Sequence, residues 1–252
     1  MKVTKLSLFG PKDPVLHADQ RWRVDVGDCV EWLRGLPDES VDLVITDPAY
    51  QSLEKHRATG TTTRLIADWF PIFPNARFAE LFTELWRVLR WNTHCYIICD
   101  QETMFHVKPI GESAGFRFWK PLIWDKQKMG MGYHYRATYE VILFFEKGKR
   151  NLHNLGIKDV LSFPRVAGGQ FVENWRERRK EKGVAYPTEK PVGLLEVLVG
   201  QSSDDGDIVI DPFIGSGSTG EAVLRCRRRF AGCDITDRAA ALARARLMEA
   251  VA

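Results

Sequence analysis

Four consecutive residues, Asp47-Pro48-Ala49-Tyr50, place an acid and an aromatic ring directly after the apolar run 41–46. In open α/β sheets, ligands bind where such strands end. The Asp47 carboxylate and the Pro48 carbonyl can each accept a hydrogen bond from an amino group, and the Tyr50 ring can stack on a planar ring. This set suits an exocyclic amine on a nucleobase. The competing interpretation is a strand-ending turn in which Tyr50 packs on the core.

A glycine-rich turn follows a second strand-like run, 207–213, and leads into a helical pattern. Residues 215–220 read GSGSTG and match GxGxxG, in which the backbone approaches a ligand and a helix N-terminus offers free N–H groups. Asp234 follows Gly215 by nineteen positions at the end of another short strand, where an acid can hold a ribose diol. GxGxxG alone is shared by nicotinamide, flavin and S-adenosylmethionine (AdoMet) binders, so the flanking strand, helix and acid carry the prediction.

Together these motifs resemble those of amino-group DNA methyltransferases. DPAY resembles their [D/N/S]PP[Y/F] motif, residues 211–220 resemble their AdoMet loop, and residues 187–191 resemble their PTEKP block. The order of the motifs, with the catalytic one first, resembles the permuted β class, and the similarity extends over roughly residues 22–246. Ala49 stands where the family has a second proline, and we expect activity to survive that change.

The resemblance implies an α/β, Rossmann-like AdoMet-dependent methyltransferase fold with a doubly wound, seven-stranded sheet, an antiparallel edge hairpin and permuted motif order. Residues 1–252 are then one catalytic domain. The implied reaction is direct in-line transfer of a methyl group from AdoMet to adenine N6 on a base flipped out of DNA. An initial Asp in the motif favours adenine, and cytosine N4 is the alternative. An NAD-dependent oxidoreductase explains only the glycine turn and Asp234, and a catalytically inactive nucleic acid binding module is a third hypothesis.

The resemblance also assigns residue roles. Asp47, Pro48 and Tyr50 are the predicted catalytic residues. The predicted cofactor-binding residues are Asp28, Thr188, Lys190, Asp211, Phe213, Gly215, Gly217, Ser218, Thr219 and Asp234. Several have structural alternatives: Asp28 and Thr188 as helix N-caps, Phe213 as a core residue, and Asp211 as an acceptor for loop N–H groups.

Two segments without helical or strand periodicity, 51–74 and 147–187, are candidate DNA-facing loops, and 147–187 lies where the family has its target-recognition region. The predicted DNA-binding residues are Lys55, Arg57, Arg64, Tyr133, Arg136, Arg176, Arg178 and Arg179. A solvated helix face competes with phosphate contact near residue 178, and a plain hairpin turn competes with a base pocket over 130–136. The expected partner is double-stranded DNA; a homodimer and a cognate restriction endonuclease are expectations from the family alone.

The elements that must position these residues alternate between strands and helices, which favours a doubly wound, largely parallel sheet. The predicted strands are 22–27, 41–47, 94–99, 117–124, 138–146, 207–211 and 229–234, and the predicted helices are 28–36, 75–90, 101–114, 190–201, 217–227 and 236–251. The strands 117–124 and 138–146 read as an antiparallel hairpin at one edge of the sheet.

Composition excludes several other classes. The 252 residues suffice for one substantial core, and a net charge of +3 means that DNA contact requires local basic patches. The five cysteines are scattered without a CxxC pair, and the six histidines form no metal-binding motif, so we predict neither a disulfide framework nor a metal site. No signal-like segment or run of 18 apolar residues occurs, so we expect a cytoplasmic protein without membrane insertion.

Overall fold

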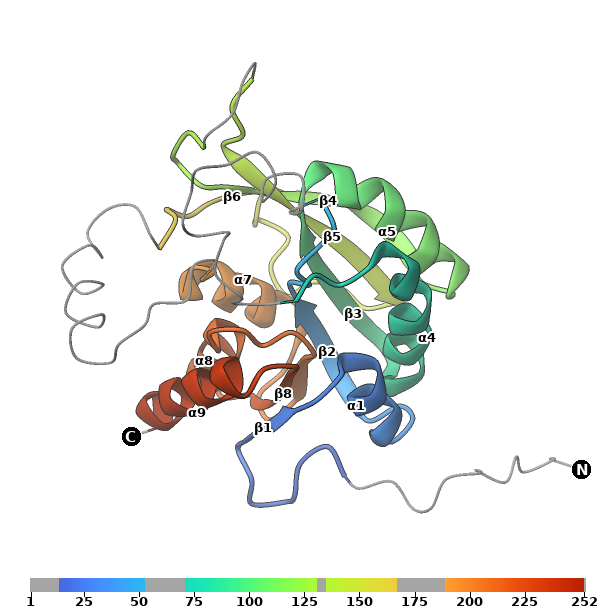
Figure 1. The fold of residues 1–252 in the computed structure, drawn as a ribbon, viewed down its shortest axis with the longest axis vertical. Helices are drawn as coiled ribbons and strands as arrows, with labels where there is room; N and C mark the ends of the chain where they lie inside the picture. Colours follow the sequence, from blue (N-terminus) through green and yellow to red (C-terminus); the bar gives the residue numbers. More distant parts are fainter. Residues whose placement is uncertain (1–13, 53–70, 131–134, 167–188, 252) are drawn as a thin grey trace, which may run out of the picture.

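The computed structural model describes residues 14–52, 71–130, 135–166 and 189–251. Within these residues, one sheet contains β1 (Trp22–Val26), β2 (Val41–Thr46), β3 (Leu89–Cys99), β4 (Arg117–Asp125), β5 (Tyr139–Lys147), β6 (Val160–Ser162), β7 (Ile208–Asp211) and β8 (Arg229–Asp234). The helices are α1 (Cys29–Gly35), η1 (Asn75–Arg77), α4 (Phe78–Val88), α5 (Gln101–Ser113), α7 (Val192–Ser202), α8 (Ser218–Arg225) and α9 (Asp237–Val251). The predicted α/β class is confirmed (Figure 1).

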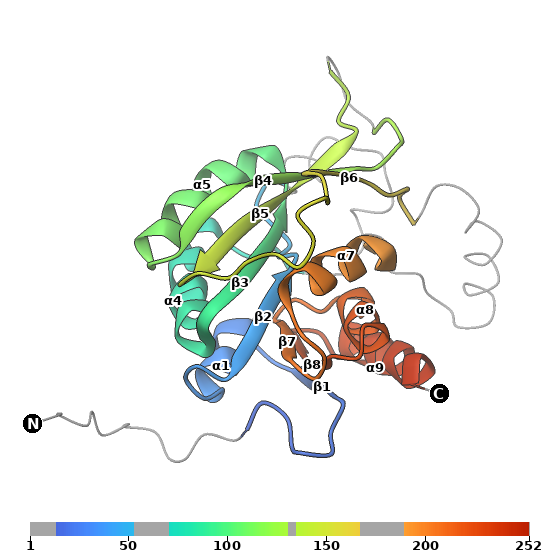
Figure 2. The same cartoon turned by 180° about the vertical axis from the view of Figure 1, so that it is seen from behind.

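The strand order is β1-β8-β7-β2-β3-β5-β4-β6. Strands β1, β8, β7, β2 and β3 are parallel neighbours, whereas β5 runs antiparallel to both β3 and β4. Seen from behind, β4, β5, β3 and β2 lie side by side (Figure 2). The predicted antiparallel hairpin is therefore present.

The described sheet has one strand more than the seven predicted, and the hairpin is not its edge, because β6 pairs in parallel with the outer side of β4. Strand β6 has only three residues, of which only the middle one is buried. Such a segment is too short to show a periodic pattern in sequence. The prediction of 94–99 was also short, since β3 begins at Leu89.

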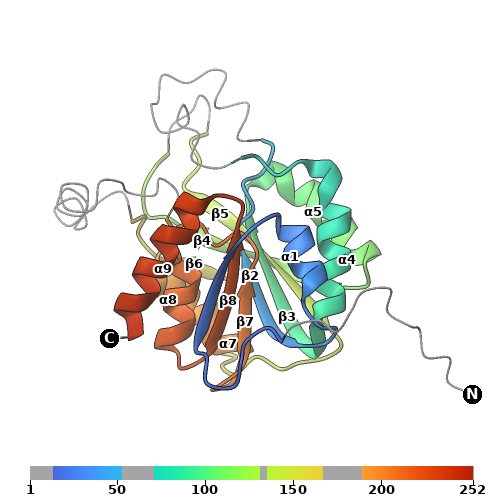
Figure 3. The ribbon, with the colours of Figure 1, turned by 60° about the horizontal axis from the view of Figure 1, so that its bottom comes forward.

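Helices cover both faces of the sheet (Figure 3). One apolar core includes residues of α1, α4 and α5, among them Leu33, Phe82 and Val107, and the other includes residues of α7, α8 and α9. Strand β2 lies between the two cores and is buried along its whole length. That position explains its nearly continuous apolar run, since a parallel strand covered on both faces has no solvent side.

All five cysteines are unpaired, and four of them are buried. Among the described residues, no His, Cys, Asp and Glu side chains cluster in the way that a metal ion requires. None of the described helices is long and apolar enough to cross a membrane.

Candidate functional site

The two motif-bearing strands lie side by side. Strand β2 pairs in parallel with β7, so Asp47 and Asp211 come to the same end of the sheet. The Thr46 hydroxyl donates a 2.7 Å hydrogen bond to Asp211 Oδ1 across 165 positions of sequence. The turn after β2 and the glycine loop after β7 therefore adjoin at this end of the sheet.

Asp47 lies against a cation. The Lys190 ammonium donates to Asp47 Oδ2, and both side chains are largely buried. Burial raises the pKa of the Asp47 carboxyl to about 6; Lys190 opposes this rise and the Glu140 carboxylate adds to it. The same burial opposes ionisation of Lys190, but the two carboxylates hold its pKa above the ordinary value. Asp47 is thus held next to an ammonium group that favours its ionised form against the effect of burial.

The rest of the DPAY turn is fixed by residue 73. Ala49 accepts a 2.7 Å hydrogen bond from the Phe73 N–H, and Tyr50 forms a β-bridge with the same residue. Tyr50 is partly buried and packs against the core, and burial raises the pKa of its hydroxyl. The alternative that Tyr50 packs on the core is confirmed, and its stacking on a base stays a prediction. This backbone pairing with Phe73 helps to hold the turn where Ala49 replaces a proline.

The predicted strand, glycine turn and helix are present, as β7, the loop after it and α8. Gly215 and Gly217 have φ of 50° and 82°, and Gly217 is the N-cap residue of α8 and makes no side-chain cap hydrogen bond. The Gly215 N–H donates to Asp234 Oδ2 at 3.1 Å, and Thr236 donates to Asp234 Oδ1 from its N–H and its hydroxyl. Asp234 therefore braces the loop, and its contact with a ribose stays a prediction. A helix N-terminus without a side-chain cap is the kind of helix end at which backbone N–H groups can bind a ligand.

Asp211 is the last residue of β7 and is almost fully buried. Its Oδ1 accepts hydrogen bonds from the Thr46 hydroxyl and from the Phe213 N–H, and its side chain is also bonded to Thr219. Burial raises the pKa of Asp211 to about 6, although these hydrogen bonds oppose the rise. The structural role anticipated for Asp211 is confirmed, and its site suits a cationic amino group that would restore the lost solvation.

Gly217 offers a test of the loop, since a Cβ there would lie 2.9 Å from the Ala243 Cα of α9. We expect Gly217→Ala to lower the unfolding free energy by about 2 to 4 kcal/mol, from a left-handed backbone and a forced shift of α9. Gly206→Ala is the matched control, because Gly206 has φ of 84° and nothing within 4 Å of the added carbon. Chemical denaturation of both variants separates the clash from the backbone cost; equal losses would contradict the close approach of α9.

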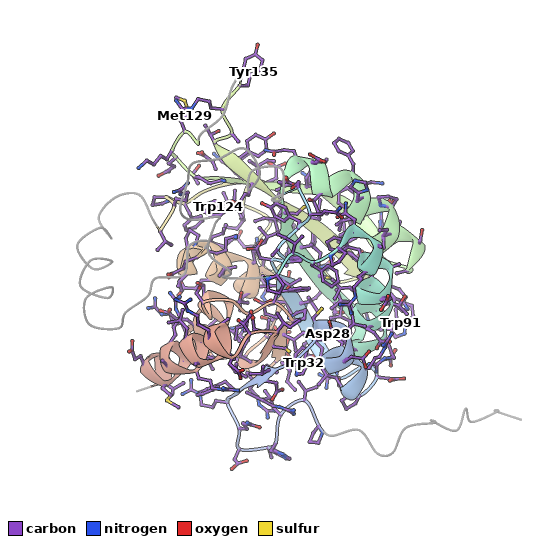
Figure 4. The ribbon with its side chains drawn as sticks, in the orientation of Figure 1. Asp28, Trp32, Trp91, Trp124, Met129 and Tyr135 are labelled. Carbon is purple, nitrogen blue, oxygen red and sulfur yellow. The ribbon has the colours of Figure 1, made fainter. Side chains whose placement is uncertain are left out.

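Asp28 has the structural role that the sequence left open. It is the N-cap of α1 and accepts hydrogen bonds from the Val30 and Glu31 N–H groups. Arg77 forms a bidentate ion pair with it, at 2.7 and 2.9 Å, and holds the pKa of the Asp28 carboxyl at about 2. The N-cap interpretation is confirmed; contact with an adenine ring stays a prediction. Asp28 directly precedes α1, and the Trp32 N–H within that helix donates to the Asp28 carbonyl at 2.9 Å; both residues are labelled in Figure 4.

Phe213 packs partly buried against the core that contains Phe73 and Phe78. Its ring meets Phe73 edge to face, with centroids 5.0 Å apart, and the Arg77 guanidinium lies 5.4 Å from the Phe73 ring centroid. The core interpretation of Phe213 is therefore confirmed in part. Phe73 links the DPAY turn, the Asp28 ion pair and the glycine loop.

Arg136 is the predicted DNA-binding residue that the structure describes. It is exposed and donates to the Gly130 carbonyl at 2.7 Å, across the connection between β4 and β5. Met129 and Tyr135 stand near the tip of this connection, away from the sheet (Figure 4). The hairpin-turn interpretation is therefore confirmed for Gly130 and Arg136, and a base pocket there stays a prediction.

The other predicted contacts to DNA, and one to the cofactor, lie outside the described residues. They are Lys55, Arg57, Arg64, Tyr133, Arg176, Arg178, Arg179 and Thr188. Most of the predicted target-recognition region 147–187 lies there as well, since residues 167–188 are not described. These assignments stay predictions.

Sequence reasoning missed several residues of the site. Glu140 of β5 and Lys126 after β4 join Lys190 and Asp47 in one chain of ion pairs. Arg246 of α9 pairs with Glu221 and with Glu189, which precedes Lys190, and also donates to the Ser216 carbonyl. Their charges resemble those of any solvated helix or strand end. Among these residues, the one with a sequence signal was Glu140, an acid at the start of an apolar strand.

A family model, a relative and two solved structures match this chain. The N6_N4_Mtase family model, described as DNA methylase, matches residues 41–245. The type II methyltransferase M.HinfI of Haemophilus influenzae is 28% identical over 242 residues, which cover 88% of this chain and 67% of that protein. Two solved structures share the fold.

The first of these structures is the M1.HpyAVI complex with S-adenosylmethionine, which has a TM-score of 0.65 and 20% identity and covers 90% of this chain and 98% of that chain. The second is the PvuII DNA methyltransferase, which is cytosine-N4-specific; it has a TM-score of 0.68 and 16% identity and covers 93% of this chain and 89% of that chain.

Proposed function

This chain belongs to the N6/N4 DNA methylase family, and from that membership we propose that it transfers a methyl group from AdoMet to the N6 amino group of adenine in DNA. DNA methyl transfer is the activity of the family. The choice of adenine rests on Asp47 as the first residue of the DPAY motif. The observation that carries the proposal is the Thr46 to Asp211 hydrogen bond, because it joins the amine-accepting turn to the glycine loop.

The glycine loop fits AdoMet. Gly215 and Gly217 hold the positive φ angles that let the backbone approach a ligand, and the acids Asp211 and Asp234 stand at the ends of adjacent strands. In the proposal, Asp211 accepts hydrogen bonds from the amino group of the methionine portion, and Asp234 accepts them from the ribose hydroxyls. Lys190 was assigned to this pocket from the PTEKP resemblance; its ammonium contacts Asp47 instead, and a cofactor contact stays a proposal.

Bound AdoMet supplies an electrophilic methyl group on a sulfonium. The exocyclic amine of a nucleobase is a poor nucleophile, because its lone pair is delocalised into the ring. Asp47 and the Pro48 carbonyl accept hydrogen bonds from its two N–H groups and orient the lone pair toward the methyl group. This is catalysis by positioning and electrostatics. Once the amine carries the methyl group and a positive charge, its proton leaves through Asp47 or to water. Tyr50 stacks on the base, which is flipped out of the duplex.

Product analysis tests the assignment. Purified protein is incubated with labelled AdoMet and unmethylated duplex DNA, and the nucleosides are identified by mass spectrometry. N6-methyldeoxyadenosine is the expected product. N4-methyldeoxycytidine would keep the mechanism and overturn the choice of base, and AdoMet binding without any product would favour a binding module.

Asp28 is proposed to meet the cofactor adenine in addition to capping α1. We expect Asp28→Ser to lower the unfolding free energy by about 1 to 3 kcal/mol through loss of the Arg77 ion pair, because serine is also a good N-cap and keeps the cap itself. The dissociation constant of AdoMet, measured by calorimetry, should rise at least about fivefold with the loss of a charged acceptor. Arg77→Met is the control, since it breaks the Asp28 ion pair and leaves the carboxylate in place. Unchanged affinity in Asp28→Ser would leave capping as the role of this residue.

A further inference from the structure

The ammonium of Lys190 lies between two carboxylates, that of Asp47 directly after β2 and that of Glu140 on β5. It contacts Asp47 Oδ2 directly, and it lies 3.6 Å from Glu140 Oε2. Only 11% of the Lys190 side chain, 24% of Asp47 and 18% of Glu140 is exposed. At this burial, competition between the two acids for one cation is weakly screened by water.

Glu140 reaches this place because of the sheet topology. Strand β5 runs antiparallel to β3, so its first residues lie where β3 ends: Val141 pairs with Cys99, and Glu140 pairs with Trp124 of β4. The parallel strand β2 ends at the same edge, with Asp47 as the next residue. An acid at the start of an antiparallel strand thus faces an acid at the end of a parallel one.

A second cation fixes the orientation of Glu140. The Lys126 ammonium donates to Glu140 Oε1 at 2.9 Å, which leaves Oε2 toward Lys190. Lys126 is itself held, because its N–H donates to the Thr138 carbonyl across the hairpin and its ammonium lies 5.8 Å from the Trp124 ring centroid. Glu140 is therefore a preset second partner for Lys190.

The proposed reaction creates a conflict that this arrangement resolves. Asp47 must accept a hydrogen bond from the target amine, yet one of its oxygens already accepts a hydrogen bond from the Lys190 ammonium. We propose that Glu140 is a positioning residue that draws the Lys190 ammonium away from Asp47 when the target base arrives, so that Asp47 is free to accept the amino group. This inference rests on the proposed function and deepens it.

The charges around Asp47 determine the direction in which a change at Glu140 shifts the pKa of Asp47. The charged or titratable groups that act on Asp47 or respond to its charge are Lys190, Glu140 on β5, Lys126 after β4, Asp211 on β7, Cys99 on β3 and Tyr50. Glu140 works to raise the pKa of Asp47, and its own pKa is held below the ordinary value by Lys190 and Lys126 in spite of burial. Removing the Glu140 charge leaves Asp47 as the partner of Lys190 within this cluster and lowers the pKa of Asp47.

The test compares Glu140→Gln, Glu140→Asp, Lys190→Met and the double variant Glu140→Gln/Lys190→Met. The Glu140→Gln variant should lower kcat/KM for DNA at least about tenfold at pH 7.5, and the acid limb of its pH profile should move at least about one pH unit lower. Glu140→Asp should restore part of the rate. If Glu140 acts through Lys190, adding Glu140→Gln to Lys190→Met should change the rate less than about twofold.

A readout without turnover accompanies the kinetics. The carboxyl signals of ¹³C-labelled aspartate are titrated by NMR, and the Asp47 signal is assigned by its loss in Asp47→Ala. Glu140→Gln should lower the measured pKa of Asp47, whereas Glu146→Gln should not; Glu146 lies near the opposite end of β5 and is paired with the Trp119 indole. An unchanged Asp47 titration, or equal rate losses with and without Lys190, overturns the inference. If the wild type does not methylate DNA but Glu140→Gln still lowers the pKa of Asp47, the proposed function is overturned. The coupling between Glu140, Lys190 and Asp47 would then still stand.

Discussion

Asp47→Ala is expected to lower the rate of methyl transfer at least about a thousandfold. The change removes the acceptor that orients the amine lone pair, and the loss of one preorganised electrostatic contact at a transition state has this order of effect. The fold should survive, because the buried Lys190 ammonium keeps Glu140 as a partner. The measurement is single-turnover methylation of saturating DNA, with AdoMet affinity determined in parallel.

The AdoMet affinity of Asp47→Ala should stay within about threefold of the wild type, because the acids of the cofactor pocket, Asp211 and Asp234, remain. Asp47→Asn is an informative companion, since its amide oxygen can still accept one amino hydrogen and should leave measurable residual activity. Retention of more than a tenth of the wild-type rate in Asp47→Ala would rule out this residue as the amine acceptor.

Asp211→Asn is expected to raise stability at neutral pH while it abolishes tight AdoMet binding. The Asn oxygen can still accept from the Thr46 hydroxyl and the Phe213 N–H, but the buried negative charge is gone. The rise of the Asp211 pKa from 3.8 to about 6 corresponds to a cost of up to about 3 kcal/mol for burying the ionised form. The variant should recover part of that energy.

The raised pKa of Asp211 determines how stability changes with pH. The pKa of Asp211 is higher in the folded than in the unfolded state, so its cost to stability is fully present above about pH 6 and fades as the pH falls toward 3.8. Asp211→Asn should thus be more stable than the wild type at pH 7.5 and about equal to it near pH 4. Denaturant titrations at the two pH values measure this difference.

The affinity for AdoMet should depend on pH in the opposite direction to stability. The wild type should bind AdoMet more weakly as the pH falls through 6, since protonated Asp211 no longer attracts a cationic amino group. In Asp211→Asn, we expect at least about a hundredfold weaker binding at pH 7.5, with little dependence on pH over this range. Wild-type affinity in this variant would show that Asp211 only braces the loop.

Much of the fold followed from local patterns. Strand β2 was predicted from its apolar run, and helix α4 from apolar residues at i, i+3 and i+4, because side chains at these spacings share a face. The glycine loop was predicted from its GxGxxG spacing, and the structure shows positive φ at Gly215 and Gly217, which glycine adopts without strain. Strand β6 was not predicted, because pairing with β4 rather than its own three residues makes it a strand.

The sequence by itself determined the chemistry present: an amine-accepting acid after one strand, a glycine loop after another, and a motif order that belongs to one family. Only the tertiary structure decided which charges meet. Thr46 reaches Asp211 across 165 positions, Arg77 reaches Asp28 across 49, and Lys190 reaches Asp47 across 143. Local sequence specifies helices and strands through periodicity, but the ion pairs depend on which strand ends the sheet order brings together. The role of Glu140 is a consequence of that order, because only an antiparallel β5 brings its first residues to the end of the parallel strands.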